Sequence, residues 1–433
     1  MNMNDLRVDG GKTPWDLQMR LWGMMFLQYF VQGCYLPVVA AYLQDALGFK
    51  PNEIGYFTAA LALGPLLAPV VVGQLVDRHF ATERVLAFCH FTGGLLMLGL
   101  YVSNGFWPVI LLGTTYSILY VPSMMLTNSL AFAHLKNRRR PFPPVRLSGT
   151  LGFILPAWLI EWVWLRNLTG AELNTARGVV FLLSGGVGLL MSVYCLSLPH
   201  TPPPKAQTGN FAPAAVLKVM MQRNFLVLVS VTIVIAMVHQ YFFTVNAPYL
   251  TYMLRQGGVQ GAWEQRISSI GQIAEILVMA GLGLAIVKLG FKKVLLAGAS
   301  AYLLRCLILA AAASWAGPFA ARMTLVCLGQ ALHGFCFGCF LAAAFIYVDR
   351  ESPNDIRGSM QTFYGTLVLG IGFFLGGLVG GWIRQSLTTG TGNQAVSDWA
   401  AIWLSGAGIA AVGLLMLLFC FPSDQPESEK STV

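Results

Sequence analysis

The sequence predicts an all-α polytopic membrane protein whose twelve transmembrane helices form two pseudo-symmetric halves of six helices each. The composition is the first reason, because 56% of the 433 residues are hydrophobic, 10% are charged and the mean hydropathy is +0.65. The second reason is that long apolar runs recur along the whole chain, and the third is a single long polar interruption near its middle. A soluble core cannot hide this much apolar surface, whereas a bilayer can.

Each predicted helix is a mostly apolar run of about 20 to 30 residues, which is the length that an α-helix needs to cross a bilayer. Polar or charged residues separate each run from the next. The runs start near Leu17, Asn52, Glu83, Phe106, Arg146, Ala176, Asn224, Arg266, Lys292, Phe319, Arg357 and Ala400.

The polar interruption divides the chain into two halves. It predicts an N-terminal half at 1–199, a cytosolic linker at 200–223, a C-terminal half at 224–422 and a polar tail at 423–433. The halves echo each other, because GQLVDRHFATERVL (73–86) has a degenerate counterpart, GLAIVKLGFKKVLL (283–296), 210 residues later. Parallel six-helix repeats of this kind place a substrate site near mid-membrane, where the halves meet.

The positive charge is distributed unevenly between the loops. The net charge is +9, and with a cytosolic N-terminus the inner loops carry fourteen Lys and Arg residues against seven in the outer loops. The positive-inside rule therefore predicts that both termini are cytosolic. We interpret the basic run KNRRR (136–140) as a topological anchor beside membrane lipid, so we expect no nucleic-acid partner.

Glu275 is the one acidic residue that the sequence places near mid-membrane. It lies about nine residues into RISSIGQIAEILVMAGLGLAIVK, or roughly 14 Å from the outer end of that helix. Every other Asp or Glu falls in a loop, a tail or a helix end. A charge at this depth costs at least about 2.5 kcal/mol on insertion scales, so Glu275 is expected to handle a proton or an ion. Ser268, Gln272 and Met279 share its helix face.

The remaining polar residues give no sign of an enzyme or a metal site. All eight cysteines fall within or at the ends of apolar spans, where Cys behaves as a small hydrophobic residue. Cys336 and Cys339 form a C-x-x-C, but no second pair or acidic ligand completes a metal site. The chain contains no H-E-x-x-H and no G-x-S-x-G motif. We expect no catalytic residue, no metal and no cofactor.

The loop after the second predicted span resembles the signature of the major facilitator superfamily. The matching residues are Gly73, Leu75, Asp77, Arg78 and Arg84. In that family, the acidic and basic side chains of this loop clamp helix ends on the cytosolic side. The resemblance implies a transporter made of two six-helix halves, in agreement with the internal repeat.

Three glycines near the end of the chain follow a helical spacing. Gly372, Gly376 and Gly380 recur every four residues in LGIGFFLGGLVGGWI (369–383). Small residues at this spacing let two helices approach closely, so we expect these glycines to serve packing.

Finer motifs resemble the nucleoside:proton symporter family within the superfamily. They are FPPVRLSGTLGFI (142–154), IGQIAEILV (270–278), LLRCLILAA (303–311) and HGFCFG (333–338), with looser similarity over nearly the whole chain. The resemblance implies proton-driven import of nucleosides through the bacterial inner (plasma) membrane. We expect the transporter to be a monomer whose partners are a small-molecule substrate, protons and lipid.

The resemblance also implies a substrate site, residue by residue. The family's substrate-facing positions fall on Arg146, Thr150, Phe153, Gln240, Phe243, Gln272, Glu275, His333 and Phe337. Guanidinium and amide donors bind ribose hydroxyls and base edges, and phenyl faces stack on a base. The chain departs from the family at Phe243, Gly338 and His333, where we expect asparagine, aspartate and tyrosine. Because two hydrogen-bonding partners are lost, the preferred ligand is expected to differ.

Several of these residues have a second interpretation. Arg146 near a helix start also fits an interfacial anchor, and Gln240 also fits an interhelical hydrogen bond. His333 suits proton coupling, with an ordinary pKa of about 6.5, but a lone histidine in an apolar helix also suits a structural hydrogen bond. Arg305 is expected to pair inside the bundle with a partner that the sequence does not identify.

These observations predict alternating access with one coupled proton. Desolvation favours the neutral form of Glu275, which takes a proton from outside, permits the loaded carrier to rock inward and then releases the proton to the cytosol. A proton-coupled sugar or oligosaccharide symporter is the nearest alternative. A drug:proton antiporter, a lipid or cell-wall precursor flippase and a non-transporting membrane sensor are further alternatives.

Overall fold

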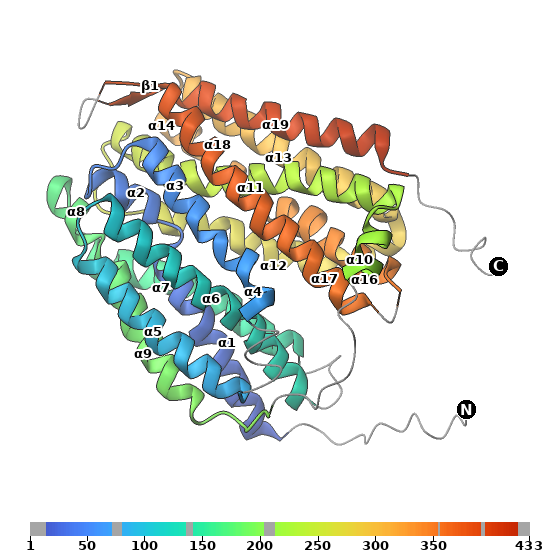
Figure 1. Cartoon of the computed structure of the whole chain (residues 1–433). Helices are drawn as coiled ribbons and strands as arrows, with labels where there is room; N and C mark the ends of the chain where they lie inside the picture. The colour runs from blue at the N-terminus through green and yellow to red at the C-terminus, as the bar shows by residue number, and fades with distance from the viewer. Residues whose placement is uncertain are drawn as a thin grey trace, which may run out of the picture. The chain divides into compact units, whose positions relative to one another are not determined.

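The computed structural model describes residues 14–71, 80–135, 142–202, 213–353, 356–390 and 395–422. The described chain is almost entirely helical (Figure 1). Within it, 11 helices are long and apolar enough to cross a membrane. The predicted span near Asn52 corresponds to α3 (Pro51–Leu61) and α4 (Leu63–Val71), which a turn at Ala62 separates. The predicted all-α membrane fold is confirmed.

The described residues group into two compact units. Unit 1 contains those within Met1–Leu47, Leu63–Gly209 and Gln260–Gln265, and unit 2 contains those within Gly48–Ala62, Asn210–Val259 and Arg266–Val433. These units resemble the two predicted halves, but α3 belongs to unit 2 and the first two residues of α12 belong to unit 1. The half and linker boundaries drawn from the sequence therefore stay predictions.

Unit 1 is a bundle in which α1 packs against α7 and α9, and α5 packs against α6 and α9. Its core includes Met24, Met25, Leu130 and Met191, all fully buried. Its elements are α1 (Trp15–Tyr35), α2 (Val39–Asp45), α4 (Leu63–Val71), α5 (Thr82–Val102), α6 (Phe106–His134), α7 (Phe142–Leu159), η2 (Ile160–Trp164), α8 (Gly170–Ala176) and α9 (Val179–Cys195).

Unit 2 is a second bundle, in which α13 packs against α19 while α11 contacts both α18 and α19. Among the described residues, three π-helical segments interrupt or extend helices, two of them in this unit. Its elements are α3 (Pro51–Leu61), α10 (Pro213–Met220), α11 (Arg223–Gln256), α12 (Glu264–Leu289), α13 (Phe291–Ser314), α14 (Phe319–Ala331), α15 (His333–Phe335), η3 (Cys336–Ala342), α16 (Ala343–Glu351), α17 (Arg357–Gly365), η4 (Thr366–Gly372), α18 (Phe373–Ser386), β1 (Thr388–Thr389), β2 (Val396–Ser397) and α19 (Trp399–Cys420). β1 and β2 pair as a short antiparallel ribbon.

Glycines set the distance between helices in unit 2. A Cβ added to Gly376 would lie 2.4 Å from the carbonyl oxygen of Met237 on α11, and one on Gly380 would lie 3.3 Å from Thr244. On another face of α18, Gly381 meets Gly55 of α3 at a Cβ distance of 2.6 Å to the Gly55 Cα. The predicted packing role of the glycine stripe is confirmed.

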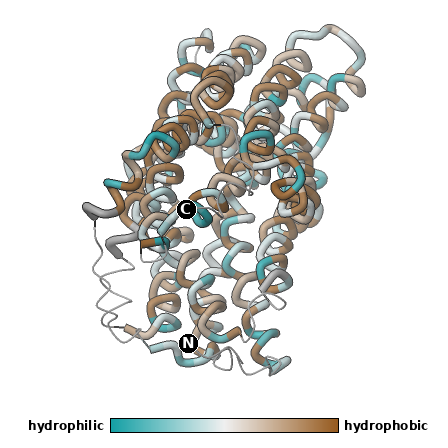
Figure 2. The backbone as a smooth tube through the Cα atoms, turned by 90° about the vertical axis from the view of Figure 1, so that its right-hand side faces the viewer, coloured by the Kyte–Doolittle hydropathy of each residue, from teal (hydrophilic) through white to brown (hydrophobic). Residues whose placement is uncertain are grey.

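The outward faces of the helices are apolar. Figure 2 shows hydrophobic residues along most of the helices. Large side chains such as Leu277 and Val287 of α12 are 71% and 84% exposed. Exposed aliphatic side chains in such number are costly in water but favourable against lipid tails.

The loop signature lies mostly outside the described residues. Gly73, Asp77 and Arg78 fall there, and only Arg84 is described, as an exposed residue in the first turn of α5. The proposed clamp of helix ends by this loop therefore stays a prediction.

Candidate functional site

Six of the predicted substrate residues belong to unit 2. Gln240 and Phe243 lie on α11, Gln272 and Glu275 on α12, His333 on α15 and Phe337 on η3. Gln240 and His333 are buried, with 8% and 4% of their surface exposed, and the other four are partly exposed.

Close backbone packing fixes Glu275 beside α15. A Cβ added to Gly334 would lie 2.5 Å from the carbonyl carbon of Ala274 and 2.7 Å from the backbone nitrogen of Glu275. One turn earlier on α12, a Cβ on Gly271 would lie 2.9 Å from the Cβ of His333. Helices that touch through glycine have little freedom to slide, so α12 holds Glu275 at a defined place next to His333.

The same packing explains a departure from the family pattern. Gly338 stands where the resemblance leads us to expect an aspartate, and a Cβ there would lie 2.8 Å from Cγ1 of Val278. The branched side chain of Val278 fills the space that a carboxylate would need. Glycine in place of the expected aspartate therefore allows closer packing of η3 against α12.

Behind these residues lies a buried cluster of polar and aromatic rings. Nδ1 of His239 lies 2.7 Å from the hydroxyl of Tyr302, and the rings of His239 and His333 have centroids 5.3 Å apart. Glu275 is near enough to Tyr302 to interact with it electrostatically. The hydrogen bond of His239 joins α11 to α13.

Arg305 completes this cluster. Its guanidinium Nη1 lies 3.0 Å from Nδ1 of His333, and its guanidinium carbon lies 3.1 Å from the centre of the Phe242 ring. The partner that the sequence left open is thus a histidine, together with an aromatic face that stabilises the cation.

The amides of Gln240 and Gln272 make no hydrogen bond with any described residue, unlike their polar neighbours. By contrast, Asn246 donates to Ser268 at 3.2 Å and accepts from Gln330 at 2.8 Å. Ser268 therefore serves a structural network between helices, although it shares the helix face of Gln272. An amide that is buried or partly buried without a protein partner is costly unless a ligand or water satisfies it.

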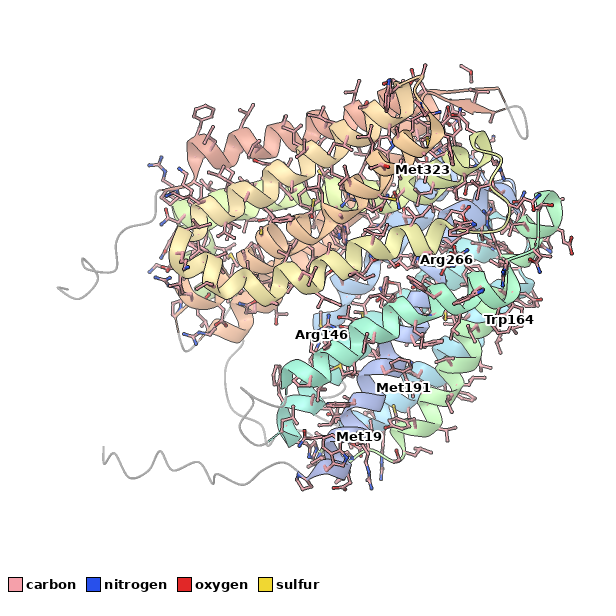
Figure 3. The ribbon with its side chains drawn as sticks, turned by 180° about the vertical axis from the view of Figure 1, so that it is seen from behind. Met19, Arg146, Trp164, Met191, Arg266 and Met323 are labelled. Atoms are coloured by element: carbon pink, nitrogen blue, oxygen red, sulfur yellow. The ribbon has the colours of Figure 1, made fainter. Side chains whose placement is uncertain are left out.

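The remaining three predicted residues lie on α7 of unit 1. Arg146, Thr150 and Phe153 follow each other at spacings of four and three residues, so they share one helix face, and all three are partly exposed. Arg146 stacks on Tyr29, with its guanidinium carbon 4.5 Å from the ring centre. Figure 3 labels Arg146 on α7 and Trp164 at the end of η2, the segment that follows α7 directly.

Arg146 makes no ion pair with another described residue. An arginine stacked on a ring keeps most of its five N–H donors for other partners. The helix begins at Phe142, which places Arg146 one turn inside it. This position fits a ligand contact and an interfacial anchor equally, so the choice rests on function.

A buried ion cluster in unit 1 was not found from the sequence. Arg177 donates to Asp45 at 3.0 Å, to Asn174 at 3.2 Å and to Glu264 through a shorter contact. The side chains of Arg177, Asp45 and Glu264 are 1%, 5% and 2% exposed. The sequence assigns all three charges to helix ends and loops, and nothing local shows that they meet.

Glu161 makes a neighbouring contact. Its carboxylate accepts a hydrogen bond of 2.7 Å from the backbone nitrogen of Gln265, the second residue of α12. Within unit 1, Glu264 and Gln265 are therefore held by contacts with Arg177 and Glu161.

The cysteines show no metal chemistry in the described part of the chain. All eight are free, and no group of three His, Cys, Asp or Glu residues is arranged to hold a metal ion there. Cys336 lies beside Arg305 and Cys339 lies against α13, where both pack as small side chains.

Comparisons with known proteins identify relatives of the whole chain. Residues 15–425 match the family described as nucleoside H+ symporter. The chain is 30% identical to the transporter YegT of Escherichia coli (strain K12), over 93% of each protein. It is 25% identical to the xanthosine permease of the same organism, over 96% of this chain and 98% of that protein.

A solved structure shows the same fold. The crystal structure of the nucleoside transporter NupG superimposes with a TM-score of 0.82, covering 94% of this chain and 100% of that chain at 22% identity. The predicted major facilitator fold is confirmed.

Proposed function

The chain belongs to the nucleoside H+ symporter family, and we propose that it imports nucleosides across the bacterial inner membrane together with protons, by alternating access. We further propose that it acts as a monomer with both termini in the cytosol. The positive-inside distribution of Lys and Arg supports this orientation.

The observation that carries the proposal is that each unit holds polar side chains whose hydrogen-bonding groups meet no other described residue. The amides of Gln240 and Gln272, the hydroxyl of Thr150 and the guanidinium of Arg146 make no hydrogen bond with another described residue. Within a membrane protein such groups are costly unless a hydrogen-bonding ligand or water meets them. Ribose hydroxyls and base edges offer the matching donors and acceptors.

Partly exposed aromatic rings supply the apolar part of such a site. Each unit contributes such rings on its own: Phe153 in unit 1 is partly exposed, and so are Phe243 and Phe337 in unit 2. Stacking of a base on an aromatic ring contributes about 1 to 3 kcal/mol per base in other proteins, whatever the base. A sugar has no π-face to use these rings in the same way, which favours a nucleoside over the oligosaccharide alternative.

We assign proton coupling to Glu275. Its helix is fixed against α15, its carboxyl is partly buried, and it interacts electrostatically with Tyr302. Protonation removes the cost of a charge at membrane depth, so the neutral carboxyl permits a conformational change that the carboxylate opposes.

The proposal is tested by uptake into proteoliposomes. Purified protein is reconstituted, and accumulation of radiolabelled uridine and adenosine is measured with and without an inward proton gradient. Accumulation above the outside concentration, abolished by a protonophore, is expected for at least one nucleoside. Accumulation of xylose or maltose instead would support the sugar alternative, and accumulation of none would contradict the proposal.

A further inference from the structure

The hydrogen bond between Arg305 and His333 fixes the protonation of the imidazole. Arginine carries only N–H donors, so Nη1 of Arg305 donates and Nδ1 of His333 accepts across the 3.0 Å contact. An imidazole accepts at Nδ1 only when its proton is on Nε2. His333 is therefore neutral in this structure, with Nε2–H as a donor.

The geometry around Arg305 leaves it little freedom to release His333. Its side chain is 1% exposed, and its guanidinium covers the Phe242 ring at 3.1 Å from guanidinium carbon to ring centre. The imidazole of His333 stacks on the same Phe242 ring, with centroids 6.0 Å apart and planes 28° apart. Ring and guanidinium are thus held by one aromatic neighbour.

The Nε2–H of His333 has no acceptor among the described residues. The side chain of His333 is 4% exposed. Its Nε2 atom is not fully enclosed by other atoms of the protein. The ring of Phe243 stands edge-on to the imidazole at 5.8 Å, and both Phe243 and Phe337 are partly exposed. The buried ring that carries this donor thus packs against Phe243, which is partly exposed.

We propose that His333 selects nucleosides whose base presents a carbonyl oxygen where other nucleosides carry an amino group, and that Arg305 is the positioning residue that fixes the donor. The inference rests on the proposed function and specifies the substrate class of the same site. Base stacking on the phenyl rings brings the edge of the base to a donor that cannot become an acceptor.

The discrimination follows from donor and acceptor chemistry. A carbonyl oxygen of the base accepts a hydrogen bond from Nε2–H of His333. The guanidinium of Arg305, which donates to Nδ1, polarises the imidazole and strengthens this bond. An exocyclic amino group is itself a donor, so it leaves two donors facing each other and both unsatisfied. The expected preference for the oxo base is about tenfold or more.

Inosine and adenosine form a matched pair for the test, because they share the purine riboside and differ at the six-position, where inosine has an oxygen and adenosine an amino group. Competition of each with a radiolabelled nucleoside in proteoliposomes gives the ratio of their half-inhibitory concentrations. The wild-type protein is expected to bind inosine about tenfold or more tightly than adenosine.

Two variants separate a direct role from a structural one. His333→Phe keeps a flat ring and removes both nitrogens, so the ratio is expected to fall to about one. Arg305→Lys keeps a donor for Nδ1 of His333 and is expected to retain the preference for inosine. Arg305→Met removes this donor, so the proton of the imidazole can move to Nδ1, and the preference is expected to fall. Leu328→Ala, at an apolar position of α14 that is 53% exposed, is the control that should keep the wild-type ratio.

The outcomes distinguish this inference from the proposed function. If both nucleosides are transported without preference, or if His333→Phe keeps the wild-type ratio, the inference is wrong and the proposed function stands. If the wild-type protein transports no nucleoside, the proposed function fails and the inference fails with it. Loss of folded protein in the Arg305 variants leaves the His333→Phe ratio as the deciding result.

Discussion

Gly334 of α15 lies directly against the backbone nitrogen of Glu275 in α12, so that a Cβ on Gly334 would lie 2.7 Å from that nitrogen. Real Cβ atoms do not approach backbone this closely, and a helix backbone cannot yield as a side chain can. The position of Glu275, the residue that we propose couples the proton, therefore depends on a residue with no side chain.

Gly334→Ala is predicted to push α12 away from α15. We expect a loss of about 1 to 3 kcal/mol of stability, as for other overpacked interiors, and weaker proton-driven uptake because Glu275 is displaced. Thermal melting in detergent and uptake in proteoliposomes measure the two effects. Gly283→Ala on the same helix is the control, because its Cβ would meet nothing within 4 Å. Equal melting of both variants would contradict this account of the packing.

Gly338→Asp is predicted to destabilise the protein although it restores the residue expected from the family. The new Cβ would lie 2.8 Å from Cγ1 of Val278, and the carboxylate would need space that this side chain fills. The double variant Val278→Ala, Gly338→Asp is expected to recover most of the lost melting temperature, because alanine makes room. A single variant as stable as the wild type would show that Val278 does not exclude the acid.

Arg177→Gln is predicted to be strongly destabilising, since it removes the guanidinium that the buried carboxylates of Asp45 and Glu264 share. Removing one partner of a buried pair costs roughly 3 to 5 kcal/mol. Melting in detergent is the measurement, and Arg166→Gln is the control, because Arg166 is an exposed residue of the same unit. The charge exchange Arg177→Glu, Glu264→Arg should recover part of the loss, and a mild effect of Arg177→Gln would mean that the cluster contributes little.

Arg146→Gln is predicted to weaken substrate binding and to leave stability nearly unchanged. Arg146 makes no ion pair with a described residue, so the expected loss in melting temperature is small, whereas KM is expected to rise about tenfold or more if its guanidinium meets the ligand. Arg146→Lys should recover part of the affinity but not the stack on Tyr29. An unchanged KM with altered topology would favour the interfacial anchor instead.

The positions of the helices could be predicted from the sequence because apolar length and turn residues are local properties. The predicted start near Phe106 agrees with α6, which begins at that residue, and the start near Asn224 is one residue after the beginning of α11. The shared face of Arg146, Thr150 and Phe153 follows in the same way from the helical repeat alone.

The partners of buried charges could not be predicted, because they depend on which helices meet. Arg305 and His333 are 28 residues apart in the chain, and Arg177 and Glu264 are 87 apart. The sequence held one clue to the first pair. His333 replaces the tyrosine expected from the family, and Arg305 had no partner that the sequence could identify. The reason for Gly338 is likewise a tertiary contact, with the side chain of Val278.

Uptake by the Glu275→Gln variant tests the central claim most directly. Glutamine keeps the size and polarity of the side chain but cannot carry a titrating proton. In proteoliposomes that contain internal nucleoside, the variant is expected to exchange radiolabelled nucleoside across the membrane while failing to accumulate it under an inward proton gradient. Uphill accumulation equal to that of the wild type would contradict the assignment of proton coupling to Glu275.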